Sequence, residues 1–371
     1  MSVELVQLAK GKIIGTDDIH LEELIQVDTN VPSSYVAMWD ISKGENDKVK
    51  AYLTGSGSNL SLHIYGVGEM KNFAQLSLQQ SPYYTAPWAS YSSRIKHIYI
   101  HDGVTSIGQL TFFGYHGNYS SFYSLSTLSI ADTVRTINRY AFYYALISDI
   151  TIPEGVRRIH EGAFALYSTA SVSVTIPNSV CIIDYSAFRN TQWFNGLPNG
   201  FTTVGDGCLV QYVGSSTQLT LPQGTKCVSL FNWSNKSSCT SVTLPNSIKY
   251  LAVGAFSGFS SLSSVKLPQG CRRISFNAFS SDSNLRAVFI PQSVTEISSR
   301  SIMTATGEMS CIPGLSPFYG ASSNLKIYCE AAEKPVAFDE YWDYTGADTR
   351  ATVYWGVSEQ EYDAIQNGGD V

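Results

Sequence analysis

Pairs of apolar residues, separated by one residue, recur at a regular interval along most of the chain. Each pair precedes a fixed anchor position, which is proline at Pro153, Pro177, Pro222, Pro245, Pro268 and Pro291. The steps between these prolines are 24, 45, 23, 23 and 23 residues, and His101 and Ala131 keep the phase upstream. The apolar pairs are Ile98/Ile100, Leu128/Ile130, Ile150/Ile152, Val174/Ile176, Leu219/Leu221, Val242/Leu244, Val265/Leu267 and Val288/Ile290. Alternation of this kind in β-branched residues predicts eight short strands, each with one buried face.

The opposite face of each predicted strand carries one residue per copy, and we expect it to point to solvent. These residues are Tyr99, Ser129, Thr151, Thr175, Thr220, Thr243, Lys266 and Phe289.

Further core positions follow each anchor at fixed distances. Apolar residues stand three and six positions later, as in Val156/Ile159 and Ile248/Leu251. Eleven positions later comes a large side chain, giving an aromatic spine of Phe112, Phe142, Phe164, Phe188, Trp233, Phe256 and Phe279, with Ile302 in the last copy. One coil of about 23 residues cannot bury its own inward face, whereas stacked coils share a continuous core. The pattern therefore predicts a β-rich repeat solenoid over residues 95–302, with eight clear coils and one degenerate coil inside the 45-residue step.

The repeated string resembles a known family. IPEGVRRIHEGAF (152–164) and LPNSIKYLAVGAF (244–256) are similar to the BspA-like (TpLRR) leucine-rich repeats. LHIYGVGEMKNF (62–73), NTQWFNGLPNG (190–200) and IYCEAAEKP (327–335) resemble the flanking and irregular segments of such proteins. The resemblance implies a right-handed coil stack with a strand-lined concave face and a role in adhesion or protein binding. It implies no particular ligand.

The ends of the chain differ from its repeated body. Residues 1–35 read as a separate attachment or cap segment, in which Leu21, Leu24 and Ile25 suggest one helical face. Residues 36–94 read as strands and turns of a small β cap, and residues 303–371 as a C-terminal cap. Caps are expected because an open end coil would expose its apolar edge. Ser358 and Glu361 have capping-box spacing and predict a final helix over 358–366.

Charge and cysteine content exclude several classes of protein. The net charge is −6, and the three segments 1–94, 95–302 and 303–371 carry −3, +5 and −8. A duplex nucleic-acid binder is normally far more basic, so none is expected as a partner. No stretch reaches the apolar length of a membrane span or forms a signal peptide, so no membrane insertion is expected. Seven cysteines without a CxxC pair argue against a zinc site and against a complete disulfide framework, and Cys271 holds a core phase.

Catalytic motifs are missing from the sequence. It has no GxSxG, HExxH, P-loop or EF-hand string, and its six histidines are scattered. We therefore expect a non-enzymatic protein without cofactor, metal site or catalytic residues.

Three surfaces are candidates for ligand binding. Four positions after the anchor, one phase holds five cations that stacking would gather on one edge, which suits an anionic partner: Arg135, Arg157, Lys226, Lys249 and Arg272. The outward strand row offers Tyr99 and His97 at one end and Lys266, Arg286 and Phe289 at the other, and aromatic residues beside arginine are typical of binding hot spots. An insertion at 114–124 adds Tyr115, Tyr119 and Tyr123.

These features favour a non-catalytic recognition or adhesion protein whose solenoid presents an extended surface to a protein or glycan ligand. By family resemblance it would lie outside the cell or on its surface. The alternatives are a structural virion component, such as a phage tail or head appendage with a host-binding solenoid, and an enzyme with an unrecognised site in the caps. The sequence does not specify the oligomeric state.

Overall fold

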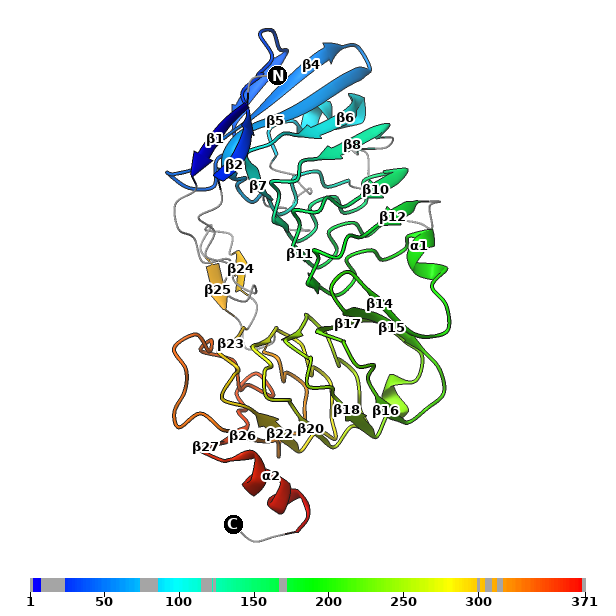
Figure 1. The fold of residues 1–371 in the computed structure, drawn as a ribbon, viewed down its shortest axis with the longest axis vertical. Coiled ribbons are helices and arrows are strands. Elements are labelled where there is room, and N and C mark those ends of the chain that lie inside the picture. The colour runs from blue at the N-terminus through cyan, green and yellow to red at the C-terminus, as the bar shows by residue number, and fades with distance from the viewer. Residues whose placement is uncertain are drawn as a thin grey trace. The chain divides into compact units, whose positions relative to one another are not determined.

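The structure is a computed structural model that describes residues 3–7, 24–73, 86–114, 122, 125–166, 172–298, 301–303, 309–311 and 316–368. The chain forms two compact units, Met1–Leu197 and Pro198–Val371. The division falls inside the predicted repeat region, at its irregular coil. In both units the predicted strands form, and each coil pairs in parallel with its neighbours (Figure 1).

The first unit begins with antiparallel strands and continues as parallel coils. β1 (Val3–Gln7) pairs with β2 (Leu24–Asp28), and β3 (Ala37–Asp40), β4 (Lys48–Ser56) and β5 (Asn59–Glu69) form an antiparallel meander. After η1 (Ala89–Arg94), one strand column contains β6 (Ile95–Ile100), β8 (Thr127–Ile130), β10 (Asp149–Thr151) and β12 (Ser173–Thr175). A second column contains β7 (Val104–Ile107), β9 (Thr136–Ile137), β11 (Arg158–Ile159) and β13 (Ile182–Ile183), and α1 (Gln192–Asn195) follows.

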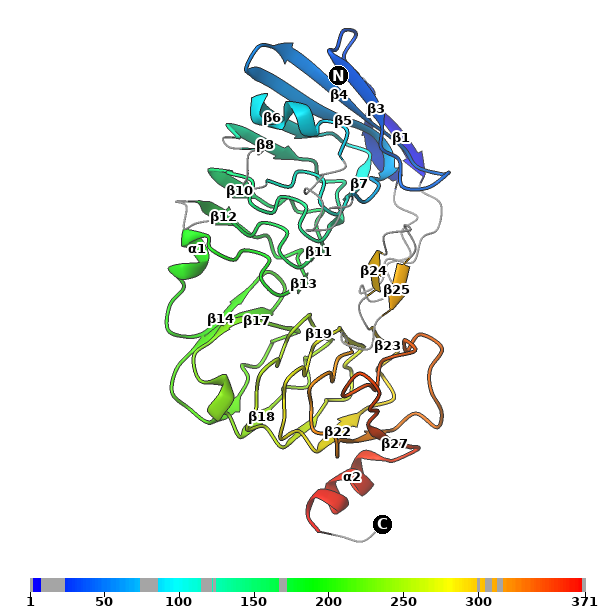
Figure 2. The ribbon, with the colours of Figure 1, turned by 180° about the vertical axis from the view of Figure 1, so that it is seen from behind.

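β5 connects the meander to the coils, because it pairs in parallel with both β6 and β7. Figure 2 shows the two strand columns of this unit from behind. The helical face expected from Leu21, Leu24 and Ile25 is wrong, since Leu24 and Ile25 lie in β2. Leu21 lies outside the described residues. β2 is attached to the first coil by a backbone bond from the Asp28 N–H to the Asp102 carbonyl (3.0 Å).

The second unit repeats the two-column plan. β14 (Gly200–Val204) and β15 (Cys208–Val213) form an antiparallel pair, and β15 continues in parallel through β17 (Cys227–Trp233), β19 (Tyr250–Leu251), β21 (Arg273–Ile274) and β23 (Glu296–Ile297). The other column contains β16 (Gln218–Thr220), β18 (Ser241–Thr243), β20 (Ser264–Lys266), β22 (Ala287–Ile290), β26 (Lys326–Cys329) and β27 (Thr352–Trp355). The remaining elements are η2 (Lys236–Ser238), the antiparallel pair β24 (Ser301–Met303) and β25 (Met309–Cys311), and α2 (Glu359–Gln366).

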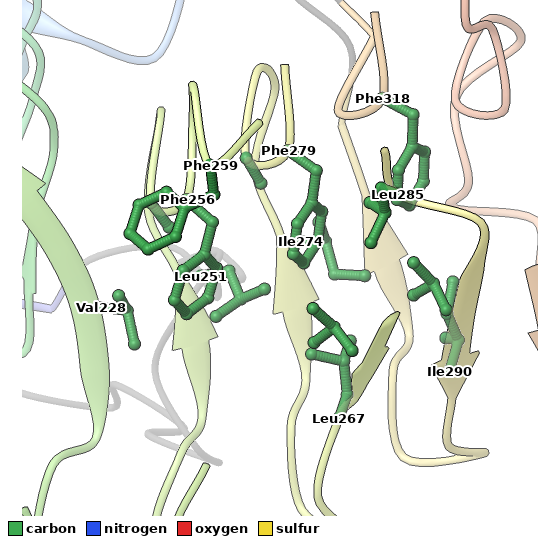
Figure 3. Close-up of a cluster of buried hydrophobic side chains, with 14 of the residues drawn as sticks. Val228, Leu251, Phe256, Phe259, Leu267, Ile274, Phe279, Leu285, Ile290 and Phe318 are labelled. Atoms are coloured by element: carbon green, nitrogen blue, oxygen red, sulfur yellow. The ribbon is translucent and has the colours of Figure 1, made fainter. Parts of the chain in front are cut away.

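The aromatic spine forms the core of each unit. In the first unit the Phe142 ring stacks on the rings of Phe112 and Phe164 at centroid distances of 4.9 and 5.0 Å. In the second, Phe279 stacks on Phe256 at 5.6 Å, with its ring directed inward among aliphatic side chains (Figure 3). All five rings are fully buried, which confirms the prediction for these positions.

The last position of the predicted spine is occupied by a different residue. Phe318, not Ile302, stacks on Phe279 at 5.5 Å, and the Phe279 N–H donates to the Pro317 carbonyl (2.7 Å). In the preceding coil the Phe256 N–H makes the same bond to Ala278 (2.7 Å). The paired residues Val288 and Ile327 are 39 positions apart, which is 16 more than the 23-residue repeat. A 16-residue insertion thus lengthens this coil, and parallel pairing continues past residue 302 through β26 and β27.

Two further predictions for unit 2 are confirmed. α2 begins after Ser358 with a complete capping box, in which the Ser358 side chain accepts from the Glu361 N–H and the Glu361 carboxylate accepts from the Ser358 N–H. Cys271 is fully buried, and burial raises the pKa of its thiol to about 12. Within the described ranges, no helix is long and apolar enough to cross a bilayer.

Candidate functional site

A ladder of aromatic rings marks the first end of the outward strand row, in unit 1. Parallel pairing of β5 with β6 sets His63 opposite Tyr99, and their rings stack at 4.8 Å. Beside them, the rings of Tyr65 and His101 stack at 3.8 Å. Except for Tyr65, which is buried, these side chains are partly exposed. We define the ring ladder as His63, Tyr65, Tyr99 and His101.

Hydrogen bonds fix the two histidines of the ring ladder. His101 Nδ1 lies 3.0 Å from Asp28 Oδ2, and His101 Nε2 lies 3.2 Å from His63 Nδ1. Burial, together with nearby His101 and His97, lowers the pKa of His63 to about 4. Burial also lowers the pKa of His101, although Asp28 partly offsets this effect. Both imidazoles are therefore neutral at neutral pH, and each has one acceptor and one donor nitrogen. Both nitrogens of His101 already face Asp28 and His63.

The face around the ring ladder includes further hydrogen-bonding groups. His97 extends the ladder, with its ring nitrogens 3.1 Å from Thr127 Oγ1 and 3.2 Å from Asn59 Oδ1. Ring edges, imidazole nitrogens and a phenol together bind polar ligands that also have apolar surface. Across the residues that the structure describes, no three His, Cys, Asp or Glu side chains are arranged to hold a metal ion.

The sequence identified Tyr99 and His97 but missed three of their neighbours. His63, Tyr65 and Asp28 come from β5 and β2. Residues 36–94 were predicted to cap the first coil, but the pattern did not predict which of their side chains lie beside Tyr99. Alternation within LHIYGVG was the available signal, because Leu62 and Ile64 are buried and the residues between and after them turn to the opposite face.

The other end of the strand row is covered. Phe289 is fully buried, so the expectation that it is exposed is wrong. The Tyr362 ring of α2 lies 5.3 Å from the Phe289 ring and 5.4 Å from that of Tyr328. Lys266 is half-exposed, and its Nζ lies 2.9 Å from Asp363 and 3.1 Å from Glu359. Ala287, Phe289 and Tyr328 would otherwise form an apolar outward strip, which explains why α2 packs here.

Arg286 remains exposed beside this covered strip. Its role in ligand binding, like that of Lys266, stays a prediction.

The basic positions stack as predicted within each unit. In unit 2 the Lys249 N–H donates to the Lys226 carbonyl (2.7 Å), and the Arg272 N–H donates to the Lys249 carbonyl (2.8 Å). These three cations therefore occupy successive coils, although Lys226 Nζ is paired with Asp206 (2.6 Å).

In unit 1 the corresponding bond joins the Arg157 N–H to the Arg135 carbonyl (2.9 Å). The guanidinium groups of both arginines also donate to carbonyls of their own turns, Arg135 to Asp132 (2.6 Å) and Arg157 to Glu154 (2.9 Å). Binding of an anionic partner by these five cations stays a prediction.

Tyr115, Tyr119 and Tyr123 of the predicted insertion lie outside the described residues. The coil that follows contains a tyrosine group that sequence reasoning missed. Tyr143 and Tyr144 stack at 3.9 Å with their hydroxyls 2.8 Å apart, and the Tyr140 hydroxyl donates to Glu161 (2.8 Å). The YAFYY string (140–144) was the available signal.

Comparison with known proteins supports the repeat assignment. The family described as "BspA type Leucine rich repeat region (6 copies)" matches residues 86–209 and 202–310. These segments cover more than half of the chain, so the chain belongs to this leucine-rich-repeat family. No curated protein matches the sequence.

Solved structures of bacterial leucine-rich-repeat proteins are also similar to this chain. A protein from Eubacterium ventriosum is 18% identical over 86% of this chain and 85% of its own, with a TM-score of 0.33. A leucine rich cell surface protein from Faecalibacterium prausnitzii is 15% identical over 92% and 100%, with a TM-score of 0.28. A protein from Bacteroides ovatus is 18% identical over 82% and 98%, with a TM-score of 0.27. The family assignment rests on the repeat match and not on these superpositions.

Proposed function

We propose that this chain is a non-catalytic recognition protein that acts outside the cell or on its surface and binds a protein or glycan ligand. The contact surface is the outward strand face of unit 1, centred on the ring ladder. We also propose that the coils follow a right-handed course and that residues 36–94 and 303–371 cap the solenoid.

One observation carries this choice of surface. At the ring ladder, partly exposed rings stand on a sheet whose other face is buried core, and hydrogen bonds hold the imidazoles in place. Ordered aromatic groups lose little conformational entropy on binding and are typical of interface hot spots. The equivalent strip in unit 2 is occupied by α2.

The test uses the full chain on a glycan array and on a panel of purified surface proteins and polymers. The double variant Tyr99→Ala/His63→Ala is expected to lose binding at least tenfold, because it removes one stacked pair of rings. Tyr354→Ala is the matched control, since Tyr354 is an outward strand tyrosine of unit 2 that is 40% exposed. Equal binding by the double variant and the wild type, or no binding by the wild type to any probe, would refute the proposal.

A further inference from the structure

The apolar strip beneath α2 is a surface of unit 2 that already holds a helix. It consists of Ala287 and Phe289 of β22 and Tyr328 of β26, and α2 packs on it (Figure 1). Phe289 pairs in register with Tyr328 on one side and with Lys266 of β20 on the other. The Tyr362 ring of α2 is buried against both aromatic rings. One outward row of three strands thus combines two aromatic rings with a cation at its end.

Lys266 makes this strip selective for acidic helices. Its Nζ lies 2.9 Å from Asp363 and 3.1 Å from Glu359. Glu359 and Asp363 are four residues apart and Tyr362 comes three residues after Glu359, so the three side chains share one side of the helix. The strip therefore recognises a helical pattern in which an aromatic residue has a carboxylate three residues before it and another one residue after it.

Few buried groups attach α2 to the strip. Tyr362 is the one buried residue among its eight, and the side chains of its ion pairs with Lys266 are half-exposed and add little stability. Gly356, which joins α2 to β27, is exposed and has a left-handed φ of 73°, a position where glycine changes conformation at low cost. Segments with so few buried contacts open at a lower free-energy cost than the strands of the core. α2 can therefore leave the strip while β22 and β26 stay paired.

We infer that the strip is a docking site for an acidic amphipathic helix of a partner protein, and that α2 competes with that helix from within the chain. The partner's helix carries the same pattern as α2, an aromatic residue between two carboxylates, and it binds as a helix lying in an apolar groove. Because α2 is tethered, its effective concentration at the strip is high, so the partner must bind more tightly than a free copy of α2. This inference concerns unit 2 and does not depend on the ring ladder.

The test uses the full chain and, as the probe, a fluorescent peptide with the sequence of residues 357–368. Fluorescence anisotropy should show at least tenfold tighter binding to Tyr362→Ala than to the wild type, because the variant's own α2 no longer competes. Asp363→Lys in the chain should have the same effect, since it repels α2 from Lys266 and leaves every buried ring in place. The test therefore does not depend on the folding of Tyr362→Ala. A peptide of the same composition in scrambled order is the control, and circular dichroism and a thermal melt establish that each variant is folded.

An exchange of charges assigns the binding to the strip. Lys266→Glu, added to Tyr362→Ala, should weaken peptide binding at least tenfold, and a peptide with Glu359→Lys and Asp363→Lys should restore it. Lys236→Glu is the matched control, because Lys236 is an exposed lysine of η2 in the same unit, and it should leave binding unchanged. Absence of peptide binding to the folded variants, equal binding by the wild type and both opened variants, or binding that Lys266→Glu does not change would each overturn the inference.

Discussion

One repeat phase of the coils has left-handed backbone conformation. Nine residues after the anchor stand Tyr140, Gly162 and Ser186, with φ of 57°, 63° and 61°. L-residues with a side chain pay about 1–2 kcal/mol for this conformation, whereas glycine does not. The geometry of the coil therefore requires a left-handed φ at this phase, and a different residue adopts it in each of these three coils.

Replacing Gly162 with alanine should destabilise unit 1 by about 1–3 kcal/mol, from the left-handed φ and a steric clash. A Cβ at this position would lie 2.4 Å from the Tyr140 ring. Ser186→Ala is the control, because Ser186 already has a Cβ at the same phase, and it should change stability by less than about 1 kcal/mol. Urea unfolding measures both, and equal effects would contradict both the strain at a left-handed φ and the Tyr140 contact.

Asp282 is a buried acid whose environment opposes ionisation. Its side chain is fully buried, and burial raises its pKa to about 8 although its Oδ1 accepts the Phe259 N–H (2.8 Å). Because the folded pKa lies above the unfolded one, the stabilisation that Asp282 provides is complete below pH 4. It is lost as the pH rises through about 8.

Asp282→Asn should remove this pH dependence. The amide keeps an acceptor for Phe259 and cannot ionise, so the variant should exceed the wild type in stability by a few kcal/mol at pH 9 and differ little at pH 4. Melting temperatures across this range measure the difference. Parallel pH profiles for the two proteins would contradict the assignment.

At the scale of elements, α2 shows how a short helix can be held by one strand face. Its eight residues are too few for stability in isolation. The capping box satisfies its N-terminal N–H groups, and Tyr362 buries its ring against Phe289 and Tyr328. Packing and capping together are therefore required.

Tyr362→Ala should release α2 and expose the apolar strip beneath it. Tyr362 is 2% exposed, so the loss should approach the usual cost of about 3–5 kcal/mol for a large buried ring. Binding of a hydrophobic dye should rise with it. The control Tyr354→Ala removes a tyrosine that is 40% exposed, and a dye signal equal in both variants would argue against the covering role of α2.

Sequence periodicity predicted the elements well where each coil kept its length. The strands, the buried rings from Phe112 to Phe279 and the capped final helix follow from spacing alone. The pattern failed at Phe318, because the 16-residue insertion moved the next ring out of phase. It also failed at Phe289 and at the ring ladder, where α2, β2 and β5 dock from outside the repeat. Periodicity describes one coil and its neighbours, and it contains no information about non-repeating segments.

At the scale of the molecule, the repeat places residues of the same phase next to one another on successive coils, so that their side chains form one continuous surface. The net charge is −6, yet stacking places Lys226, Lys249 and Arg272 on successive coils. Their electrostatic fields add along the edge and would attract an anionic polymer. Dissolved salt would weaken this attraction by screening the charges.

Lys249→Glu/Arg272→Glu should leave the melting temperature nearly unchanged, because exposed and half-exposed charges contribute little to stability. It should abolish any salt-sensitive part of binding to an anionic glycan and leave binding through the ring ladder intact. Titration of each protein with the anionic glycan at low and high ionic strength separates the salt-sensitive binding from binding through the ring ladder. Unchanged salt dependence in the double variant would remove this edge as a binding surface.

The thiols allow the opening of individual coils to be followed in time. Cys208, Cys227, Cys239, Cys271 and Cys329 are buried thiols distributed along unit 2, whereas Cys181 in unit 1 is partly exposed. A water-soluble alkylating reagent should modify Cys181 first. Each buried cysteine should react only as fast as its own coil opens, because opening exposes the thiol and removes the burial that raises the pKa of Cys271 and Cys329. Mass spectrometry of timed samples would then reveal which coils separate first and whether opening starts at the ends of the ladder or within it.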